Sequence, residues 1–346
     1  MKRGFALIAA AAIALVSISA AGAKSTKSTD TTITGAGSTL VAPLVSAWTK
    51  PVGHAFGYTV QYSAVGSGAG IAAITSRSVD FGASDAPLTP SQAQACKGCV
   101  QIPWALSATT LSYNVPGIPN DLHLSAPVIA GIYLGQITNW NDPQIAALNP
   151  KRTFPNLKIT PVFRSDGSGD TYAFTDYLTH VSATWSSKVG NATAVQFPAG
   201  IGAKGNSGVA GVISETKGAI GYISAAYGLP NHLKVAAIKN NDGVFATPGL
   251  RGIQAAANLV TSVPANNEMH IVDPAASSAA KLAYPISTFT YVIVPQKTQL
   301  APELRKFIFW ALTQGQQTSY TSKLIFAQLP KVVLAAAEKT LKTLSQ

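Results

Sequence analysis

An arginine precedes a Ser-Gly turn by four residues in the stretch 163–171 (FRSDGSGDT). A guanidinium offers a planar fork of donors to a tetrahedral oxyanion, and the first turn of a helix offers backbone N–H groups that lack intrahelical partners. The pattern of residues 171–178 (TYAFTDYL) predicts that helix. Arg164 and Ser168 therefore belong to a candidate oxyanion clamp. A surface loop with a serine N-cap and a salt-bridged arginine fits the same stretch.

A similar loop follows the first predicted strand, residues 33–37 (ITGAG). The apolar residues after it recur at spacings of three and four, which predicts a helix that begins near Ser38. At this turn Thr39 can donate its hydroxyl and Leu40 its backbone amide. Taken alone, such a hydroxyl is equally well explained as a helix N-cap.

A third loop, 66–70 (GSGAG), follows a half-buried strand predicted over 58–62 and precedes a helix through Ser76. Its Ser67 is a further hydroxyl donor. Repeated strand-loop-helix units predict an α/β fold with a mostly parallel sheet. In such sheets the loops gather at the carboxyl ends of the strands, where ligands bind.

A carboxylate follows the next predicted strand, residues 79–84, at Asp85. A carboxylate only accepts hydrogen bonds, so it tolerates an oxyanion that carries a proton and rejects one that does not. Phosphate keeps such a proton near neutral pH and sulfate does not. The alternatives for Asp85 are an Asx cap in a turn and a salt-bridge partner for Arg164.

The N-terminus predicts export. Two basic residues precede an apolar run over 5–16, and the small residues 21–23 (AGA) form a cleavage site, so residues 1–23 are expected to be a signal peptide cleaved near Ala23. The run is too short to span a bilayer, and no cysteine near the cleavage site provides a lipid anchor. We expect a soluble exported protein with a flexible polar lead over 24–32.

Composition narrows the classes of partner. The chain has 346 residues and a formal net charge of +11, yet only 11% of its residues are charged, and no block of Lys and Arg suggests a nucleic-acid surface. A diffuse positive field favours capture of a small anion. The length and the 47% hydrophobic content suit two domains.

The two cysteines, Cys96 and Cys99, form one C-x-x-C motif. In an exported chain we interpret them as a disulfide that closes a small loop, because a zinc site would need a second pair. Catalytic dithiol chemistry is the alternative.

Motifs for catalysis are missing from the sequence. The five histidines are scattered, and neither H-E-x-x-H, G-x-S-x-G nor a phosphate-binding P-loop occurs. We therefore expect no catalytic residue, no metal site and no cofactor.

Later segments extend the α/β pattern. Strands are predicted at 159–163, 218–223 and 284–294, and helices at 143–148, 304–312 and 332–344.

Taken in order, these segments resemble the periplasmic phosphate-binding protein of ABC phosphate importers. The segments that carry the resemblance are GAGSTL (35–40), YSAVGSGAG (62–70), FGASDAPL (81–88), ITNWNDP (137–143) and RSDGSGDT (164–171), with echoes in KGNSGVAG (204–211), GAIGYI (218–223) and YPISTFTYVIV (284–294). They cover nearly the whole chain after the signal peptide. The ordered set is far more specific than any one motif.

The resemblance implies a two-lobed class II binding-protein fold, with the ligand buried in a cleft between lobes that close by a hinge. It implies a lobe I of residues 33–112 plus 284–346 and a lobe II of residues 113–283, with Tyr113 and Tyr284 near the hinge. The phosphate contacts that it implies are Thr39, Leu40, Ser67, Asp85, Arg164, Ser168, Gly169 and Asp170.

Two of these positions depart from the family's commonest pattern. Leu40 stands in place of a usual Phe, which matters little if its backbone amide makes the contact. Asp170 stands where many members have Thr or Ser, so a hydroxyl donor is lost and an acceptor is gained. The Asp170 amide can still donate.

The resemblance further implies a monomeric receptor, not an enzyme, that binds inorganic phosphate and delivers it to the membrane permease subunits of an ABC importer. Two alternatives stay open. A secreted phosphatase would need a nucleophile beside a base, or a metal cluster. An adhesin or inhibitor that keeps the same fold would act through its surface.

Overall fold

The computed structural model describes residues 31–346. The predicted signal peptide (1–23) and residues 24–30 of the predicted lead lie outside the described residues, while Thr32, at the end of that lead, already begins the first strand. None of the helices within 31–346 combines the length and the apolar character that crossing a membrane requires.

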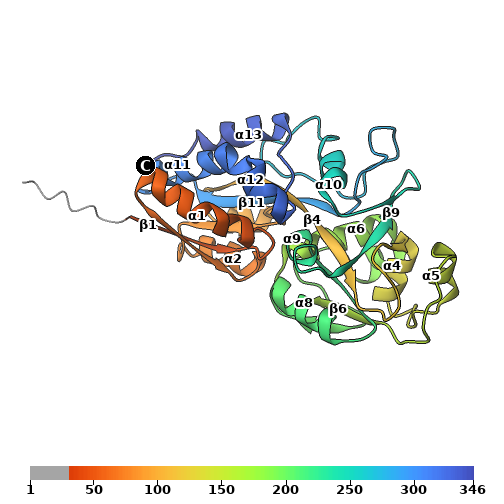
Figure 1. Cartoon of the computed structure of the whole chain (residues 1–346). Coiled ribbons are helices and arrows are strands. Elements are labelled where there is room, and N and C mark those ends of the chain that lie inside the picture. The colour runs from red at the N-terminus through yellow and green to blue at the C-terminus, as the bar shows by residue number, and fades with distance from the viewer. Residues whose placement is uncertain (1–30) are drawn as a thin grey trace, which may run out of the picture. The chain divides into compact units, whose positions relative to one another are not determined.

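Strands and helices alternate along most of the described chain (Figure 1). The strands are β1 (Thr32–Gly37), β2 (Thr59–Ala64), β3 (Phe81–Ser84), β4 (Cys99–Tyr113), β5 (Leu122–Leu124), β6 (Thr160–Arg164), β7 (Ile201–Ala203), β8 (Ala219–Ser224), β9 (Lys234–Lys239), β10 (Phe245–Ala246) and β11 (Ser287–Pro295). The helices are α1 (Ala42–Phe56), α2 (Ser67–Thr75), α3 (Pro90–Ala95), α4 (Ala126–Tyr133), α5 (Pro143–Leu148), α6 (Gly169–Val181), α7 (Ala183–Lys188), α8 (Gly205–Glu215), α9 (Ala225–Gly228), α10 (Leu250–Ala257), α11 (Ala301–Leu312), α12 (Thr318–Thr321) and α13 (Lys331–Leu341), with 3-10 turns at η1 (Gln314–Gln316) and η2 (Ser322–Leu324).

The long strand β4 belongs to two groups of strands (Figure 1). Its residues 99–108 pair antiparallel with β11, and its residues 109–113 pair antiparallel with β8. Beyond β11 the order continues through β3 and β1 to β2, and beyond β8 it continues through β6 to β7. β1 runs parallel to β2 and β3, and β6 runs parallel to β7 and β8. Each group therefore has a parallel part whose carboxyl ends can present loops.

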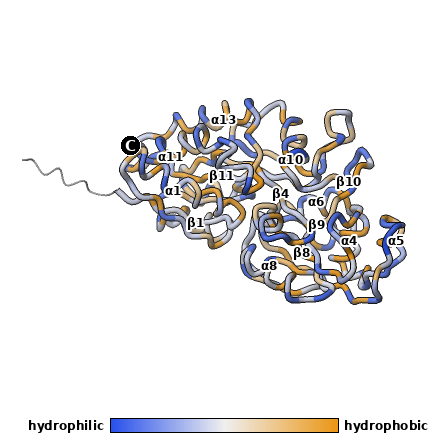
Figure 2. Tube along the Cα trace, viewed as in Figure 1, coloured by the Kyte–Doolittle hydropathy of each residue, from blue (hydrophilic) through white to orange (hydrophobic). Residues whose placement is uncertain are grey.

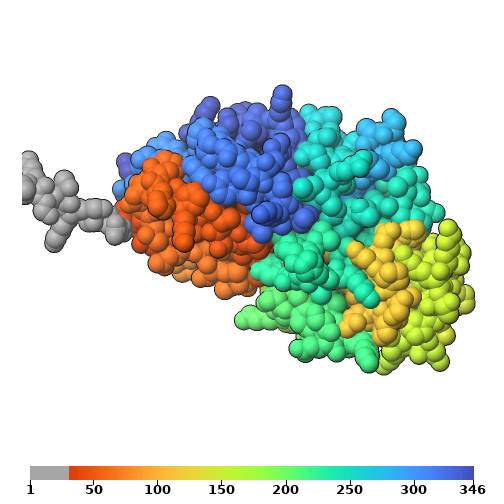
Figure 3. Space-filling model, in the orientation of Figure 1, coloured from red at the N-terminus to blue at the C-terminus, as the bar shows by residue number. Residues whose placement is uncertain are grey.

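An aromatic cluster packs the helices of the first group against its strands. The rings of Trp48 in α1 and Trp104 in β4 lie 5.4 Å apart, and those of Phe81 in β3 and Phe307 in α11 lie 5.5 Å apart. All four side chains are fully buried. Helix α1, near the start of the described chain, contacts α11, near its end. In Figure 3 these two parts of the chain form one continuous surface.

A second aromatic cluster positions helix α6 against β8. The ring of Phe174 lies 4.6 Å from the ring of Tyr133 and 4.6 Å from that of Tyr222. The Tyr222 hydroxyl accepts a hydrogen bond from the Arg164 amide at 2.9 Å. Packing in this core therefore aligns the end of β6 with the start of α6. Figure 2 shows hydrophilic residues at α5, whose one buried residue is Ile145.

Several boundaries differ from the sequence predictions. The first helix begins at Ala42 and not near Ser38, because the Ser38 hydroxyl accepts the amides of Leu40 and Val41 and holds residues 38–41 in a turn. The strand predicted over 79–84 begins later, at Phe81. Strand β4 was not predicted at all, since burial on both faces removes the alternation of apolar and polar residues that identifies a strand.

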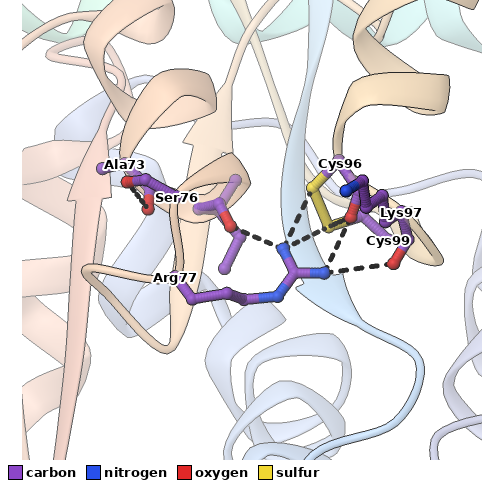
Figure 4. Close-up of a disulfide and its surroundings, with 7 residues drawn as sticks. Ala73, Ser76, Arg77, Cys96, Lys97 and Cys99 are labelled. Atoms are coloured by element: carbon purple, nitrogen blue, oxygen red, sulfur yellow. Dashed lines mark hydrogen bonds between the residues drawn. A yellow bond between two sulfur atoms is a disulfide. The ribbon is translucent and has the colours of Figure 1, made fainter.

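The two cysteines are joined in a disulfide that closes the loop after α3 (Figure 4). The guanidinium of Arg77 lies against this loop. It donates to the carbonyl of Cys96 at 2.7 Å and to the carbonyl of Ile74, at the end of α2, at 2.6 Å, and its Nη1 lies 3.2 Å from Cys99 Sγ. Arg77 thereby ties the ends of α2 and α3 together.

Replacing both cysteines by serine is expected to lower the free energy of unfolding by about 2 kcal/mol, because the unfolded chain regains the entropy of a very short loop. Urea denaturation measures the change. Adding a thiol reductant should destabilise the native protein by a similar amount and leave the double variant unaffected. Equal stability of the native protein with and without the reductant would contradict this role for the disulfide.

Candidate anion-binding site

The first half of the site lies at the carboxyl ends of β1 and β3. Ser38 follows β1 and Asp85 follows β3, and the Ser38 hydroxyl donates to Asp85 Oδ1 at 2.6 Å. Ser67 begins α2, and its hydroxyl oxygen accepts the Asp85 amide at 3.2 Å. Because parallel strands end at the same edge of a sheet, residues distant in sequence meet here.

The second half lies where β6 gives way to α6. Arg164 is the last residue of β6, and Ser168 caps α6 by accepting the Thr171 amide at 3.3 Å. The Arg164 side chain is 1% exposed. It donates through Nε to Asp166 Oδ1 at 2.7 Å and through Nη1 to Asp170 Oδ2 at 3.3 Å.

Hydrogen bonds join the two halves. The Ser67 hydroxyl oxygen accepts the Gly169 amide at 3.1 Å, and the Gly68 amide donates to the Gly167 carbonyl at 2.9 Å. The structure thus brings together all eight residues to which the resemblance assigned phosphate contacts: Thr39, Leu40, Ser67, Asp85, Arg164, Ser168, Gly169 and Asp170. Their roles as ligands stay predictions.

The residues that support this set were not predicted from the sequence. Asp166 pairs with Arg164, and Ser38 holds both Asp85 and the Leu40 amide. The remaining supports are Thr109, Asn206 and Tyr222. The sequence offered a weak signal for Ser38 and Asp166, which lie inside the Gly-Ser loops already singled out. It offered none for Thr109, which lies on the unpredicted strand β4.

Several donors of the site have no acceptor among residues 31–346. Arg164 carries five N–H groups, and three of them donate to Asp166 and Asp170. The hydroxyl protons of Thr39 and Ser168 and the backbone amide of Asp170 likewise make no hydrogen bond within this part of the chain. Buried donors left unpaired are costly, so a group of them points to an acceptor from outside the protein.

Burial and neighbouring charges shift the titration of the carboxyls. Burial, together with the nearby charge of Asp170, raises the pKa of Asp85 to about 7, although Ser38, Arg164 and Ser67 oppose the shift. Burial raises the pKa of Asp170 as well, and Arg164 limits that rise. Burial would also raise the pKa of Asp166, but its hydrogen bond and ion pair with Arg164 lower it. Near neutral pH, Asp85 is therefore balanced between its charged and neutral forms.

The arrangement can bind a tetrahedral oxyanion that carries a proton. Arg164 and the unpaired hydroxyl and amide groups can donate to oxyanion oxygens, and ionised Asp85 can accept a proton-bearing one. Within residues 31–346, no group of three or more His, Cys, Asp or Glu side chains is placed to hold a metal ion.

Gly169 allows the start of α6 to approach Asp85. A Cβ atom at Gly169 would lie 2.4 Å from Asp85 Cβ and 2.4 Å from Asp85 Oδ2, closer than packed atoms tolerate. A Cβ at Gly211, inside α8, would meet nothing within 4 Å. A side chain at position 169 would therefore clash with Asp85, whereas one at position 211 would not, so Gly211 serves as the control for Gly169.

We expect Gly169→Ala to lower the free energy of unfolding by about 1–3 kcal/mol, because the added methyl group forces α6 away from Asp85. Gly211→Ala should leave stability unchanged or raise it by up to about 1 kcal/mol, since Ala is the better helix former. Chemical denaturation of the two variants tests the contrast. A Gly169→Ala protein as stable as the Gly211→Ala protein would show that the close approach is not required.

The chain is similar in sequence to a known family and to known proteins. Residues 22–314 match the family model described as PBP superfamily domain. The phosphate-binding protein PstS of Xylella fastidiosa (strain Temecula1) is 37% identical over 302 residues, which cover 86% of this chain and 81% of that protein. The PstS of Pasteurella multocida is 34% identical over 317 residues, which cover 90% of both.

The fold of this chain is similar to that of a solved structure. The crystal structure of a phosphate-binding protein from Stenotrophomonas maltophilia superimposes with a TM-score of 0.69 at 21% identity, covering 89% of this chain and 93% of that one. At this identity the likeness concerns the fold alone. Together with the family model, it confirms the predicted two-lobed α/β binding-protein fold.

Proposed function

This chain belongs to the PstS family of phosphate-binding proteins within the PBP superfamily, and we propose that it is an extracytoplasmic receptor for inorganic phosphate that serves an ABC importer. The observation that carries the proposal is the fully buried Arg164 guanidinium, which keeps two N–H groups without acceptors among the described residues and lies in the same network as Asp85. That combination suits an oxyanion that both accepts and donates hydrogen bonds.

The proposed contacts divide by chemistry. The two remaining N–H groups of Arg164, the hydroxyls of Thr39 and Ser168 and the amide of Asp170 donate to phosphate oxygens. Asp85 accepts the phosphate proton. Three further contacts are proposed for the amides of Leu40 and Gly169 and the hydroxyl of Ser67. The two amides now donate to Ser38 and Ser67 and would exchange these hydrogen bonds for bonds to phosphate.

Phosphate would lie between two lobes, which we assign to residues 33–112 with 284–346 and to residues 113–283. This division is supported by β4, which leaves one group of strands for the other at residue 109. A second connection lies near Tyr284, whose hydroxyl donates to the Thr109 carbonyl at 3.3 Å. A hinge there would let the lobes open to release phosphate to the permease.

The proposal includes export, a monomeric state and the absence of catalysis. Export is supported by the signal-peptide pattern of residues 1–23. A binding role without turnover is supported by the site itself, because among residues 31–346 no His or Lys contacts the hydroxyls of Thr39 and Ser168, which are bonded to Asn206 and to the Thr171 amide. A phosphatase would need such a base beside a nucleophile.

Isothermal titration calorimetry of phosphate-stripped protein tests the proposal. The titration is run at pH 9, well above the pKa of about 7 of Asp85, so that this carboxylate is ionised while phosphate still keeps one proton. Phosphate should bind, and sulfate should bind at least about 100-fold more weakly, because an unprotonated oxyanion opposes the ionised Asp85 carboxylate without a proton between them. Asp85→Asn should narrow that difference more than it weakens phosphate binding, since an amide can donate to either anion.

Asp142→Asn is the control, because Asp142 caps the peripheral helix α5 and should affect neither anion. Absence of phosphate binding, or equal affinity for the two anions in the native protein, would refute the proposed function.

A further inference from the structure

Asn206 links residues from both halves of the site. It lies in the first turn of α8 and is fully buried. Its side-chain nitrogen donates to Thr39 Oγ1 at 2.9 Å and to Asp170 Oδ2 at 2.8 Å. Thr39 follows β1 and is 167 residues away in sequence, so this side chain bridges segments that meet only in the folded protein.

A backbone amide sets the orientation of the Asn206 side chain. The Ser224 amide donates to Asn206 Oδ1 at 2.9 Å. Because an amide N–H can only donate, the Asn206 atom that faces it must be the oxygen, and the NH2 group must face the opposite way. Both of its hydrogens are then used, one by Thr39 and one by Asp170.

This orientation determines what the Thr39 hydroxyl can do. A hydroxyl has one proton to donate, and the hydrogen bond from Asn206 occupies its oxygen as an acceptor. No residue within 31–346 accepts the Thr39 proton. Asn206 therefore leaves the Thr39 hydroxyl as a donor, which is the role that an oxyanion requires.

The same side chain gives Asp170 a structural role. The Asp170 carboxylate accepts from Thr109 Oγ1 at 2.7 Å, from Asn206 at 2.8 Å and from Arg164 at 3.3 Å. Three donors nearly fill its capacity of about four. The carboxylate thus anchors Arg164 and Asn206, which gives the acceptor at position 170 a structural role.

We infer that Asn206 is a positioning residue that orients the Thr39 hydroxyl proton toward bound phosphate and, through Asp170, holds the Arg164 guanidinium in place. The inference rests on the proposed function, because it assigns Asn206 a part in the same site. It predicts that Asn206 strengthens phosphate binding through its hydrogen bond to Thr39, although Asn206 lies in α8 and Thr39 follows β1.

A double-mutant cycle on phosphate affinity tests this coupling. Thr39→Val should weaken phosphate binding about tenfold or more, since it removes a hydrogen bond to a charged ligand. Asn206→Ala should weaken binding by a similar factor in the native background. In the Thr39→Val background its effect should be at least about threefold smaller, because the hydroxyl that it orients is absent. Only the part that acts through Asp170 remains.

Thr39→Ser is the matched control, because it keeps the hydroxyl and should keep the full effect of Asn206→Ala. If Asn206→Ala fails to fold in thermal unfolding, Asn206→Ser replaces it. Additive effects of Thr39→Val and the Asn206 substitution would overturn the inference while the native protein still bound phosphate. Failure of the native protein to bind phosphate would instead overturn the proposed function and this inference with it.

Discussion

The burial of the Arg164 guanidinium is the constraint on which the rest of the site depends. A buried cation is tolerated only when anions and acceptors surround it. Asp166 and Asp170 provide the charge, and Thr109 and Asn206 hold Asp170 in place. Two N–H groups of the guanidinium still have no acceptor among residues 31–346. An exchangeable oxyanion completes the set and can also leave it.

The three carboxylates of the site have different partners and therefore different roles. Asp166 and Asp170 pair with Arg164, while Asp85 makes no ion pair with it and is held by the hydroxyls of Ser38 and Ser67. Burial and the charge of Asp170 raise the pKa of Asp85 to about 7, although Ser38, Arg164 and Ser67 oppose the rise. Asp85, which is proposed to select a protonated oxyanion, follows β3, whereas Arg164, which is proposed to compensate the charge of that oxyanion, ends β6. Hydrogen bonds from Gly169 to Ser67 and from Asn206 to Thr39 hold these two segments together.

Local patterns predicted those parts of the molecule that local forces determine. The helix expected at 143–148 has those bounds, because a proline and an aspartate cap mark its start. Where a side chain competed with the backbone, as Ser38 does before α1, the predicted boundary was wrong. The candidate ligands came from loops with clear turn signals. Thr109 and Asn206 could not be predicted, since their contacts depend on which distant strands and helices lie side by side.

A crystal structure of the protein with bound phosphate tests the central claim most directly. We predict that phosphate contacts Arg164, Thr39, Ser168 and the Asp170 amide, with Asp85 as the acceptor of its proton. The Asp170 carboxylate should remain on Thr109 and Asn206. A phosphate bound without Arg164, or one contacted by the Asp170 carboxylate in place of its amide, would contradict the account.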